Sequence, residues 1–237
     1  MKRNLLAVVS GASRGIGKAL VRKFASEGFD IAACARNWED LAILKTEIEQ
    51  EFPESKIYTY TADVSSKTEV KVFADFIKSL KIPLEVLVNN AGKFIPGAIY
   101  EEKEDVLEKL MQTNLYSAYF LTKSLISEFM QQKSGHIFNI CSVASFMAYP
   151  NGGSYAISKH ALLGFSRCLR EEMKPYNVRV TSVMPGATLT DSWEGINLPS
   201  SRFATPEDIA EIVYASYALS KNSVVEEIVI RPQLGDI

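Results

Sequence analysis

The chain has 237 residues, of which 47% are apolar and 23% are charged, which is typical of one globular α/β domain. Its net charge of −2 argues against a protein that wraps nucleic acid, and no apolar run approaches the ~20 residues of a membrane span. The first residues lead into a strand-like run rather than a signal peptide. We therefore expect a single domain over residues 1–237, located in the cytoplasm, without nucleic-acid or membrane partners.

Short apolar runs alternate with segments of helical periodicity along the whole chain. The predicted strands are 5–9, 30–35, 57–61, 86–88, 136–141, 178–184 and 226–230. Helices are expected between them, including one from about 103 to 130 that is interrupted near Thr113 and one over 154–174. Thr205, followed by Pro206, is predicted to open the last helix. This order predicts an α/β fold with one doubly wound, seven-stranded parallel sheet.

The cysteine and histidine content excludes several kinds of site. Cys34, Cys141 and Cys168 stand alone in apolar segments, so we expect reduced core residues rather than disulfides. The only histidines are His136 and His160, which excludes a His-rich metal site, and no metal is expected.

A glycine-rich turn follows the first predicted strand and opens the first helix. Its glycines allow a sharp turn and close approach to a pyrophosphate, and the helix N-terminus offers free N–H groups to the anion. This position favours a dinucleotide site over a tight connector without a ligand. The predicted cofactor-binding residues here are Gly11, Ser13, Arg14, Gly15, Ile16 and Gly17.

The end of the second strand indicates which dinucleotide binds. An NAD site usually has an acidic residue there, but this chain has Arg36. Asp30 lies about 20 Å away at the other end of the strand, at ~3.3 Å per residue. Arg36 and Arg14 together suit a 2′-phosphate, although both are also compatible with solvated surface side chains. The sequence therefore favours NADP(H), with NAD(H) possible.

A second group of polar residues follows the fifth strand. Tyr155 and Lys159 are one helical turn apart, and Ser142 stands at the end of the strand before them. An ammonium about 4 Å from a phenol favours the phenolate by up to ~4 kcal/mol, so we expect a lowered pKa for Tyr155. Tyrosine and lysine at this spacing are also common on surfaces, but ligands of open α/β sheets bind at this edge. The group therefore predicts a general acid–base site.

Taken in order, these motifs resemble the short-chain dehydrogenase/reductase family over essentially the whole chain. The residues that carry the resemblance are the glycine turn, Asn89-Asn90-Ala91-Gly92, Asn114, Ser142, Tyr155, Lys159 and Pro185-Gly186. The resemblance implies a Rossmann-like three-layer αβα sandwich and an NAD(P)-dependent carbonyl reductase or alcohol dehydrogenase. It also implies that the protein is a homodimer or homotetramer.

The resemblance also assigns catalytic roles. Tyr155 would protonate the substrate carbonyl oxygen, and Ser142 would orient that oxygen. Lys159 would hold the nicotinamide ribose and tune Tyr155, so Tyr155 and Lys159 also count as cofactor-binding. Asn114 would anchor a water relay to Lys159, or would simply cap the helix that follows it.

Further cofactor contacts are implied at the ends of other strands. Asn90, Ala91 and Gly92 would lie along the cofactor, while Asn89 is expected to brace its own turn. Asp63 and Val64 would face the adenine, although Asp63 also suits a loop-stabilising role. The remaining expected contacts are Pro185, Gly186, Thr188 and Thr190, with Thr190 at the carboxamide or phosphates.

Some features depart from the family pattern or narrow it. Ser10 replaces the usual threonine of the glycine motif but keeps a hydroxyl. The C-terminal segment lacks the glycine-rich tail of 3-oxoacyl-carrier-protein reductases and looks more like reductases of small hydroxy acids, aldehydes and diketones. Residues 188–204 are expected to form a short mobile lid over the substrate. Candidate pocket walls, if they are not ordinary core, are Phe94, Val143, Phe146 and Tyr149.

The helix after Asn114 bears on assembly. Its apolar residues cover more than half of its circumference, whereas packing on one sheet face needs a stripe of only ~100°. The surplus predicts association into a homodimer or homotetramer. These residues are Ala118, Tyr119, Leu121, Leu125, Ile126, Phe129 and Met130.

The leading functional hypothesis is an NADPH-dependent reductase of a small, largely apolar ketone or aldehyde. The alternatives are an enzyme like the 3-oxoacyl-carrier-protein reductases, an NAD-linked alcohol dehydrogenase, and a non-catalytic NADP-binding regulator. A binder would need neither Ser142 nor the spacing of Tyr155 and Lys159, which argues against the regulator.

Overall fold

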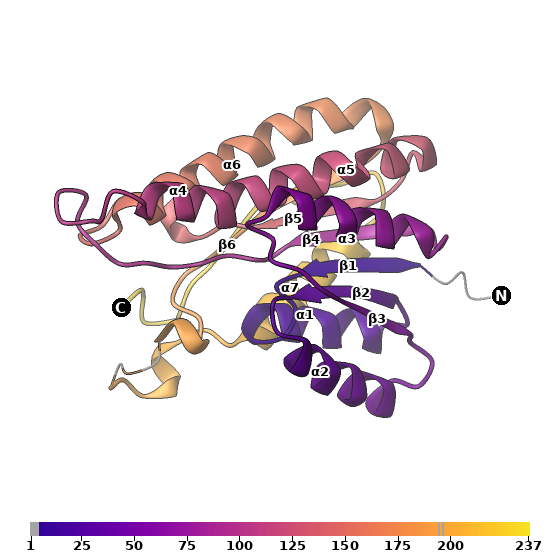
Figure 1. Ribbon diagram of the computed structural model, residues 1–237, viewed down its shortest axis with the longest axis horizontal. Helices are drawn as coiled ribbons and strands as arrows, with labels where there is room; N and C mark the ends of the chain where they lie inside the picture. Colours follow the sequence, from indigo (N-terminus) through magenta and orange to yellow (C-terminus); the bar gives the residue numbers. More distant parts are fainter. Residues whose placement is uncertain (1–4, 194, 196) are drawn as a thin grey trace.

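A computed structural model describes residues 5–193, 195 and 197–237, without the side chain of Ser192. Seven parallel strands form one sheet in the order β3-β2-β1-β4-β5-β6-β7 (Figure 1). The strands are β1 (Leu6–Ser10), β2 (Asp30–Ala35), β3 (Ile57–Thr61), β4 (Leu84–Asn89), β5 (His136–Ile140), β6 (Arg179–Pro185) and β7 (Glu227–Ile230). The predicted α/β fold and its parallel sheet are confirmed. Of the predicted lid over 188–204, residues 194 and 196 lie outside the described residues.

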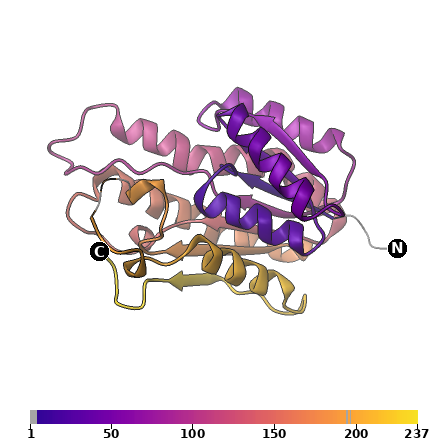
Figure 2. The same ribbon diagram turned by 90° about the horizontal axis from the view of Figure 1, so that it is seen from below.

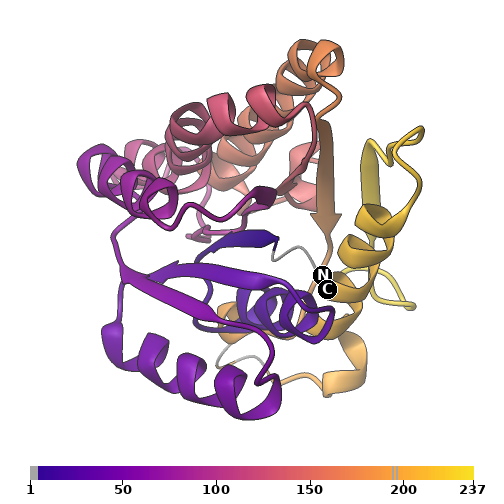
Figure 3. The same ribbon diagram turned by 90° about the vertical axis from the view of Figure 1, so that its right-hand side faces the viewer.

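Helices cover both faces of the sheet, as Figure 3 shows, and form the expected three-layer Rossmann-like sandwich. One layer is α1 (Gly15–Ser26), α2 (Trp38–Glu51) and α7 (Pro206–Ala218), with α7 beside α1 (Figure 2). The other contains α3 (Lys67–Ser79), α5 (Ser117–Gln132) and α6 (Gly153–Met173). Because both faces are covered, the central strands are buried at every residue, which explains why apolar residues predominate in them.

Local capping residues fix where several helices begin. Asn37 caps α2 by accepting a hydrogen bond from the backbone N–H of Glu39 at 2.8 Å. Thr205 caps α7 and forms a capping box with Asp208, with Pro206 at the first helical position. The start of α7 predicted from the Thr-Pro pair is therefore confirmed.

The predicted interruption near Thr113 is a turn of π-helix. The chain passes from α4 (Val106–Met111) through the π-helix Gln112–Tyr116 into α5. Such wide turns are frequent at functional sites, and this one contains Asn114. Asn114 is therefore not the cap of α5.

Other boundaries differ by one to three residues from the prediction. Strand β4 is longer than the predicted 86–88 because it also includes Leu84, Glu85 and Asn89. After α6, Pro175 lies in a separate 3₁₀ turn, Lys174–Tyr176. The prediction that all cysteines are core residues is wrong for Cys168, which is exposed, whereas Cys34 and Cys141 are buried and all three are free.

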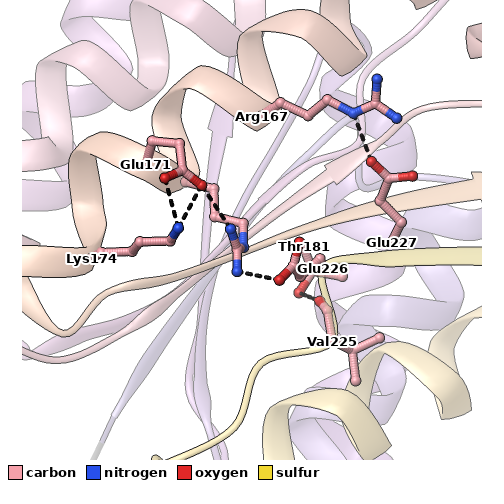
Figure 4. A network of polar contacts seen from close by, with 8 residues as sticks. Arg167, Glu171, Lys174, Thr181, Val225, Glu226 and Glu227 are labelled. Carbon is pink, nitrogen blue, oxygen red and sulfur yellow. Dashed lines mark hydrogen bonds and ion pairs between the residues drawn. The ribbon is translucent and has the colours of Figure 1, made fainter.

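Strand β7 forms one edge of the sheet and is tied to α6 by ion pairs (Figure 4). Arg167 Nε donates to Glu227 Oε1 at 2.7 Å, and Arg170 pairs with Glu226. Arg170 and Lys174 also share Glu171. Exposed pairs of this kind contribute about 0–1 kcal/mol each, so they orient the edge strand more than they stabilise the fold.

Most of the apolar surface of α5 is packed within the chain itself. Leu121, Leu125 and Phe129 are buried, and Ile126 and Met130 pack against the same core cluster. Only Tyr119, of the seven residues named for this face, has an exposed side chain, at 38%. The surplus apolar surface is thus smaller than the sequence pattern suggested.

The described residues contain neither a membrane-spanning helix nor a cluster of metal-binding side chains. No helix among them is long and apolar enough to cross a membrane. Within the same residues, no cluster of three or more His, Cys, Asp or Glu side chains could hold a metal ion.

Candidate active site

The candidate site lies where the parallel strands end. Strands β1, β4, β5 and β6 are neighbours or near neighbours and share a direction, so the segments that follow them meet at one edge of the sheet. These segments carry the glycine turn, Asn90, Ser142 and Gly186. Open α/β sheets bind ligands at this edge.

The glycine turn packs too tightly for larger residues. Gly11 has φ +64°, and a Cβ there would lie 2.8 Å from the Cα of Ala91. A Cβ on Gly17 would lie 2.1 Å from the carbonyl oxygen of Gly11. The first and third glycines therefore bring β1, α1 and the segment after β4 into direct contact.

Four hydrogen bonds that involve Ser10 and Asn90 stabilise the contact between the glycine turn and the segment after β4. The backbone N–H groups of Asn90 and Ala91 each donate to Ser10 Oγ at 3.1 Å. Asn90 Nδ2 donates to the carbonyl oxygens of Ser10 at 3.0 Å and Gly11 at 2.9 Å. The serine hydroxyl thus serves as an acceptor here, so its replacement of the usual threonine is tolerated.

The first turn of α1 has the features that suit a phosphate group. Its N-cap residue, Arg14, makes no side-chain capping hydrogen bond, and the turn contains no acidic residue. By contrast, α2, α3 and α7 are each capped by a side chain. The N–H groups of Gly15, Ile16 and Gly17 and the positive end of the helix dipole fit an anion such as a dinucleotide pyrophosphate.

The two arginines expected at a 2′-phosphate, Arg14 and Arg36, interact with different acidic residues. Arg14 Nη1 donates to Asp191 Oδ2 at 2.7 Å, an ion pair that the sequence did not reveal. Arg36 is exposed, and its charge acts on Asp63. Burial alone raises the pKa of Asp63, but hydrogen bonds from Ser65 and the charge of Arg36 outweigh it, so the pKa is lowered.

Asp63 therefore stabilises its own loop, one of the two roles considered for it. Its Oδ1 accepts from the backbone N–H of Ser65 at 2.9 Å and from the Ser65 hydroxyl at 2.7 Å. Val64 is buried in the cluster beneath α3 and α5. Their contact with an adenine stays a prediction.

Two asparagines have roles other than the local ones considered for them. Asn89 does not brace its own turn, because its Nδ2 donates to Thr122 Oγ1 at 2.9 Å and Asn139 Oδ1 at 2.8 Å. Asn114 is fully enclosed: its Oδ1 accepts from the N–H of Lys93, and its Nδ2 donates to the carbonyl of Lys93 and to Ser158 Oγ. Asn114 thereby joins the segment after β4 to the helix that carries Tyr155.

Ser142, Tyr155 and Lys159 come together at the start of α6. Ser142 lies close enough to Tyr155 to lower the pKa of the phenol against the larger effect of burial, and Ser142 Oγ accepts from the N–H of Ala144 at 3.1 Å. Lys159 Nζ donates to the carbonyl oxygen of Ile140 at 2.9 Å and lies 5.9 Å from the centre of the Tyr155 ring. The predicted grouping of these three residues is present.

The predicted lowering of the phenol pKa is wrong for this structure. Burial raises the pKa of Tyr155 to about 12 and exceeds the opposite effect of the nearby Ser142. Burial also lowers the pKa of Lys159 to about 8. The ammonium is directed at the Ile140 carbonyl rather than at the phenol, so Tyr155 holds its proton at neutral pH.

Aromatic side chains border the phenol of Tyr155. The Phe94 ring meets the Tyr155 ring edge-on, with centroids 4.9 Å apart and an interplanar angle of 79°. Phe94, Phe146 and Tyr149 are 38%, 44% and 40% exposed, which excludes ordinary core packing for them. These residues are therefore available as walls for an apolar substrate.

An open groove lies on the outer side of α6. Its lining includes Tyr100, Tyr149, Ile157 and His160. Ser142, Tyr155 and Lys159 are not part of this lining. Burial is the main cause of the raised pKa of Tyr155, and the nearby Tyr149 hydroxyl adds to it, so Tyr149 borders both the groove and the phenol. His160, given no role by the sequence, bonds through Nδ1 to the carbonyl of Ala156.

The segment after β6 rests on the glycine turn. A Cβ on Gly15 would lie 3.0 Å from Thr190 Cγ2. Thr188 pairs with Ala204 and donates from Oγ1 to the carbonyl of Gly186 at 3.1 Å, which closes the base of the segment. Thr190 is thus at the expected end of the site.

Two acidic residues near the site, Glu102 and Asp236, were not predicted from the sequence. Glu102 Oε1 accepts from the N–H of Ser154 at 3.0 Å, and Glu102 Oε2 accepts from the Ser154 hydroxyl, at the first turn of α6. Asp236 lies against Gly186, where a Cβ would come 2.4 Å from its Oδ1, and pairs with Arg231. Neither belongs to a recognisable motif, since both contacts depend on how distant segments fold together.

Comparison with known proteins defines the class. Residues 5–200 match the family described as short chain dehydrogenase. The chain is 35% identical over its whole length to a sepiapterin reductase from Chlorobaculum tepidum, 99% of which is covered. It is 31% identical to a diacetyl reductase [(S)-acetoin forming] from Staphylococcus epidermidis, over 81% of this chain and 74% of that one.

A solved structure agrees with these relatives. The alcohol dehydrogenase of the archaeon Thermococcus sibiricus, complexed with 5-hydroxy-NADP, superposes with a TM-score of 0.90 at 28% identity and covers 99% of each chain. The fold and the residues at its carboxyl edge define an NAD(P)-dependent oxidoreductase. The chain belongs to the short-chain dehydrogenase/reductase family.

Proposed function

We propose that this oxidoreductase uses NADPH to reduce the carbonyl group of a small, largely apolar ketone or aldehyde to an alcohol. The observation that carries the proposal is the meeting of Ser142, Tyr155 and Lys159 beside Phe94, at the sheet edge that also holds the glycine turn. A proton donor, a hydroxyl partner and an apolar wall are the groups that carbonyl reduction requires of the protein.

When bound, the nicotinamide cofactor supplies the hydride. Tyr155 donates its phenolic proton to the carbonyl oxygen, and its pKa of about 12 ensures that the proton is present at neutral pH. Ser142, which lies close to Tyr155, orients the same oxygen. Lys159, held by Ile140 and 5.9 Å from the centre of the Tyr155 ring, is the cation that assists reprotonation of Tyr155, and Asn114 fixes the adjoining segment.

The preference for NADPH rests on the charges near the end of β2. The described residues at the carboxyl end of β2 present Arg36 and no carboxylate, and Arg14 is in the neighbouring glycine turn. A guanidinium pair suits a 2′-phosphate better than a ribose hydroxyl. The NADP derivative bound by the related alcohol dehydrogenase supports the same preference.

The substrate site is proposed to lie between Tyr155 and the segment 188–204. Within the described part of that segment, Trp193 packs edge-on against Phe203 with centroids 5.2 Å apart, which makes it compact. We assign it the role of a lid on one catalytic domain that spans residues 1–237. The names of the relatives suggest diketones such as diacetyl, and sepiapterin, as first substrates to test.

Assembly and location belong to the same proposal. Tyr116 and Tyr119 at the start of α5 are 45% and 38% exposed, and a second copy of the chain would cover them in a homodimer or homotetramer. The three free cysteines suit a reducing compartment, so we assign the protein to the cytoplasm. Sedimentation equilibrium at micromolar concentration tests the assembly, and a monomer contradicts it.

The decisive experiment follows NADPH oxidation at 340 nm with a panel of aldehydes, diketones and sepiapterin, repeated with NADH. Turnover of at least one carbonyl compound, faster with NADPH than with NADH, is the expected result. Tight NADPH binding without turnover of any compound indicates a cofactor-binding regulator instead. Equal rates with both cofactors contradict the NADPH preference but leave the carbonyl chemistry standing.

A further inference from the structure

The glycine turn and the segment after β6 are joined by an ion pair of distant residues. Arg14 and Asp191 are 177 residues apart in the chain, and Arg14 Nη1 lies 2.7 Å from Asp191 Oδ2. Their side chains are 64% and 46% exposed, so the ion pair is accessible to solvent and Arg14 can reach an incoming anion. Arg14 is one of the two cations that the proposed function assigns to the 2′-phosphate.

Asp191 is held in this position by its backbone. Thr190, the residue before it, packs against Gly15, where a Cβ would lie 3.0 Å from Thr190 Cγ2. The N–H of Trp193 donates to the carbonyl of Thr190 at 3.0 Å, which forms a turn around Asp191. The N–H of Leu189 donates to the carbonyl of Ala204 at 2.9 Å and fixes the start of the turn. The carboxylate is therefore presented to Arg14 by a folded turn.

We propose that Asp191 sets the strength of the NADPH preference by competing with the 2′-phosphate for Arg14, an inference that rests on the proposed use of NADPH. Carboxylate and phosphate both bind a guanidinium through its N–H groups. Even where Arg14 contacts both anions, the carboxylate repels the phosphate dianion. Asp191 therefore weakens NADPH binding and leaves NADH, which lacks that phosphate, unaffected.

The competition also links the cofactor to the substrate side of the site. NADPH draws Arg14 away from Asp191 and so removes the ion pair that, together with the packing of Thr190 on Gly15, holds this turn against the glycine turn. NADH leaves the ion pair in place. Through this pair, the identity of the cofactor controls how firmly the start of the segment 188–204 is attached to the nucleotide site.

Equilibrium binding tests the inference without turnover. Asp191→Asn removes the charge at constant size, and the nicotinamide fluorescence of NADPH and NADH reports binding. For an exposed ion pair, we expect the Kd for NADPH to fall about two- to fivefold while that for NADH changes less than about 1.5-fold. The gain should shrink at about 1 M salt, where screening is strong. It should also vanish in the Arg14→Ala background.

Glu51→Gln is the matched control. It removes the carboxylate of a similarly exposed pair with Arg22, 2.5 Å long, between α1 and the end of α2. That variant should leave both dissociation constants unchanged. Asp191→Ser serves as a second variant should Asp191→Asn fold poorly.

The outcomes separate this inference from the function on which it rests. An unchanged ratio of NADPH to NADH affinity in both Asp191 variants, or the same gain without Arg14, overturns the role of Asp191. If Arg14→Ala nevertheless weakens NADPH binding, the NADPH preference survives. If Arg14→Ala and Arg36→Ala both leave NADPH binding unchanged, the NADPH preference and the role of Asp191 both fail.

Discussion

The ammonium of Lys159 donates to the carbonyl oxygen of Ile140 at 2.9 Å, and the centre of the Tyr155 ring lies 5.9 Å from it. Ile140 is the last residue of β5, and Ser142 follows two residues later. One hydrogen bond thus fixes the helix that carries Tyr155 to the end of the strand that precedes Ser142. The cost is a buried cation, which explains why the pKa of Lys159 falls to about 8.

Lys159→Met should make the protein more stable at neutral pH. Because the pKa of Lys159 is about 8 when folded and 10.5 ordinarily, the folded state disfavours the protonated lysine. This destabilisation is full below pH 8 and disappears as the pH rises towards 10.5. We expect a gain of roughly 1–3 kcal/mol in the free energy of unfolding at pH 7, reduced by loss of the Ile140 hydrogen bond.

Urea unfolding of both proteins between pH 6 and pH 10 provides the measurement. The difference in stability should be constant below about pH 7 and shrink steadily above pH 8. A difference that does not vary with pH would show that Lys159 carries no burial penalty.

Tyr155→Phe should separate catalysis from binding. Phenylalanine keeps the edge-on contact with Phe94 but has no proton to donate. General acid catalysis contributes about 10²–10⁴-fold, so kcat should fall by this factor while the Kd for NADPH stays within about twofold. Steady-state kinetics and fluorescence titration measure the two effects. Tyr149→Phe, at the second tyrosine of the site, is the control and should retain kcat within about tenfold.

Much of the site was predictable because its residues follow strands. In a parallel sheet the carboxyl ends of the strands lie at one edge, so Gly11, Asn90 and Ser142, which each follow a predicted strand, are expected at the same edge. The strand order that brings them close together is seen only in the structure. The spacing of Tyr155 and Lys159 is likewise local, since one helical turn separates them.

The rest depends on tertiary contacts that leave no local signal. Arg14 and Asp191 are 177 residues apart, and Glu102 and Ser154 are 52 apart. The pKa of Tyr155 could not be predicted from its spacing to Lys159, because burial dominates it and burial is a property of the folded chain. The apolar pattern of α5 overestimated the surface left for a second subunit for the same reason. The sequence does not show that Met130 packs against the core of its own chain.

Gly17→Ala should weaken cofactor binding and lower stability. The added Cβ would lie 2.1 Å from the carbonyl oxygen of Gly11 and 2.7 Å from Asn90 Nδ2, so the glycine turn must shift. We expect a loss of about 1–3 kcal/mol in unfolding free energy, as for overpacked sites, and at least a tenfold weaker Kd for NADPH.

Gly164→Ala is the matched control for the glycine substitution. Gly164 lies within α6, and a Cβ there meets no atom within 4 Å. Alanine should therefore stabilise the helix by about 0.5–1 kcal/mol and leave cofactor binding unchanged. Equal effects of the two substitutions on NADPH binding would refute the close packing of Gly17.

Glu102→Ala should reduce activity by loosening the start of α6. The Glu102 carboxylate accepts hydrogen bonds from the N–H and the hydroxyl of Ser154, which precedes Tyr155. Its negative charge also complements the positive end of the α6 dipole. Loss of a capping carboxylate lowers stability by about 0.5–2 kcal/mol. Because Tyr155 is in the same first turn, kcat/KM should fall about tenfold while the Kd for NADPH is retained. Asp208→Ala removes the carboxylate that completes the capping box of α7 and should lose similar stability without losing activity, as kinetics and urea unfolding of both variants will test. Should both variants keep full kcat/KM, Glu102 acts on stability alone.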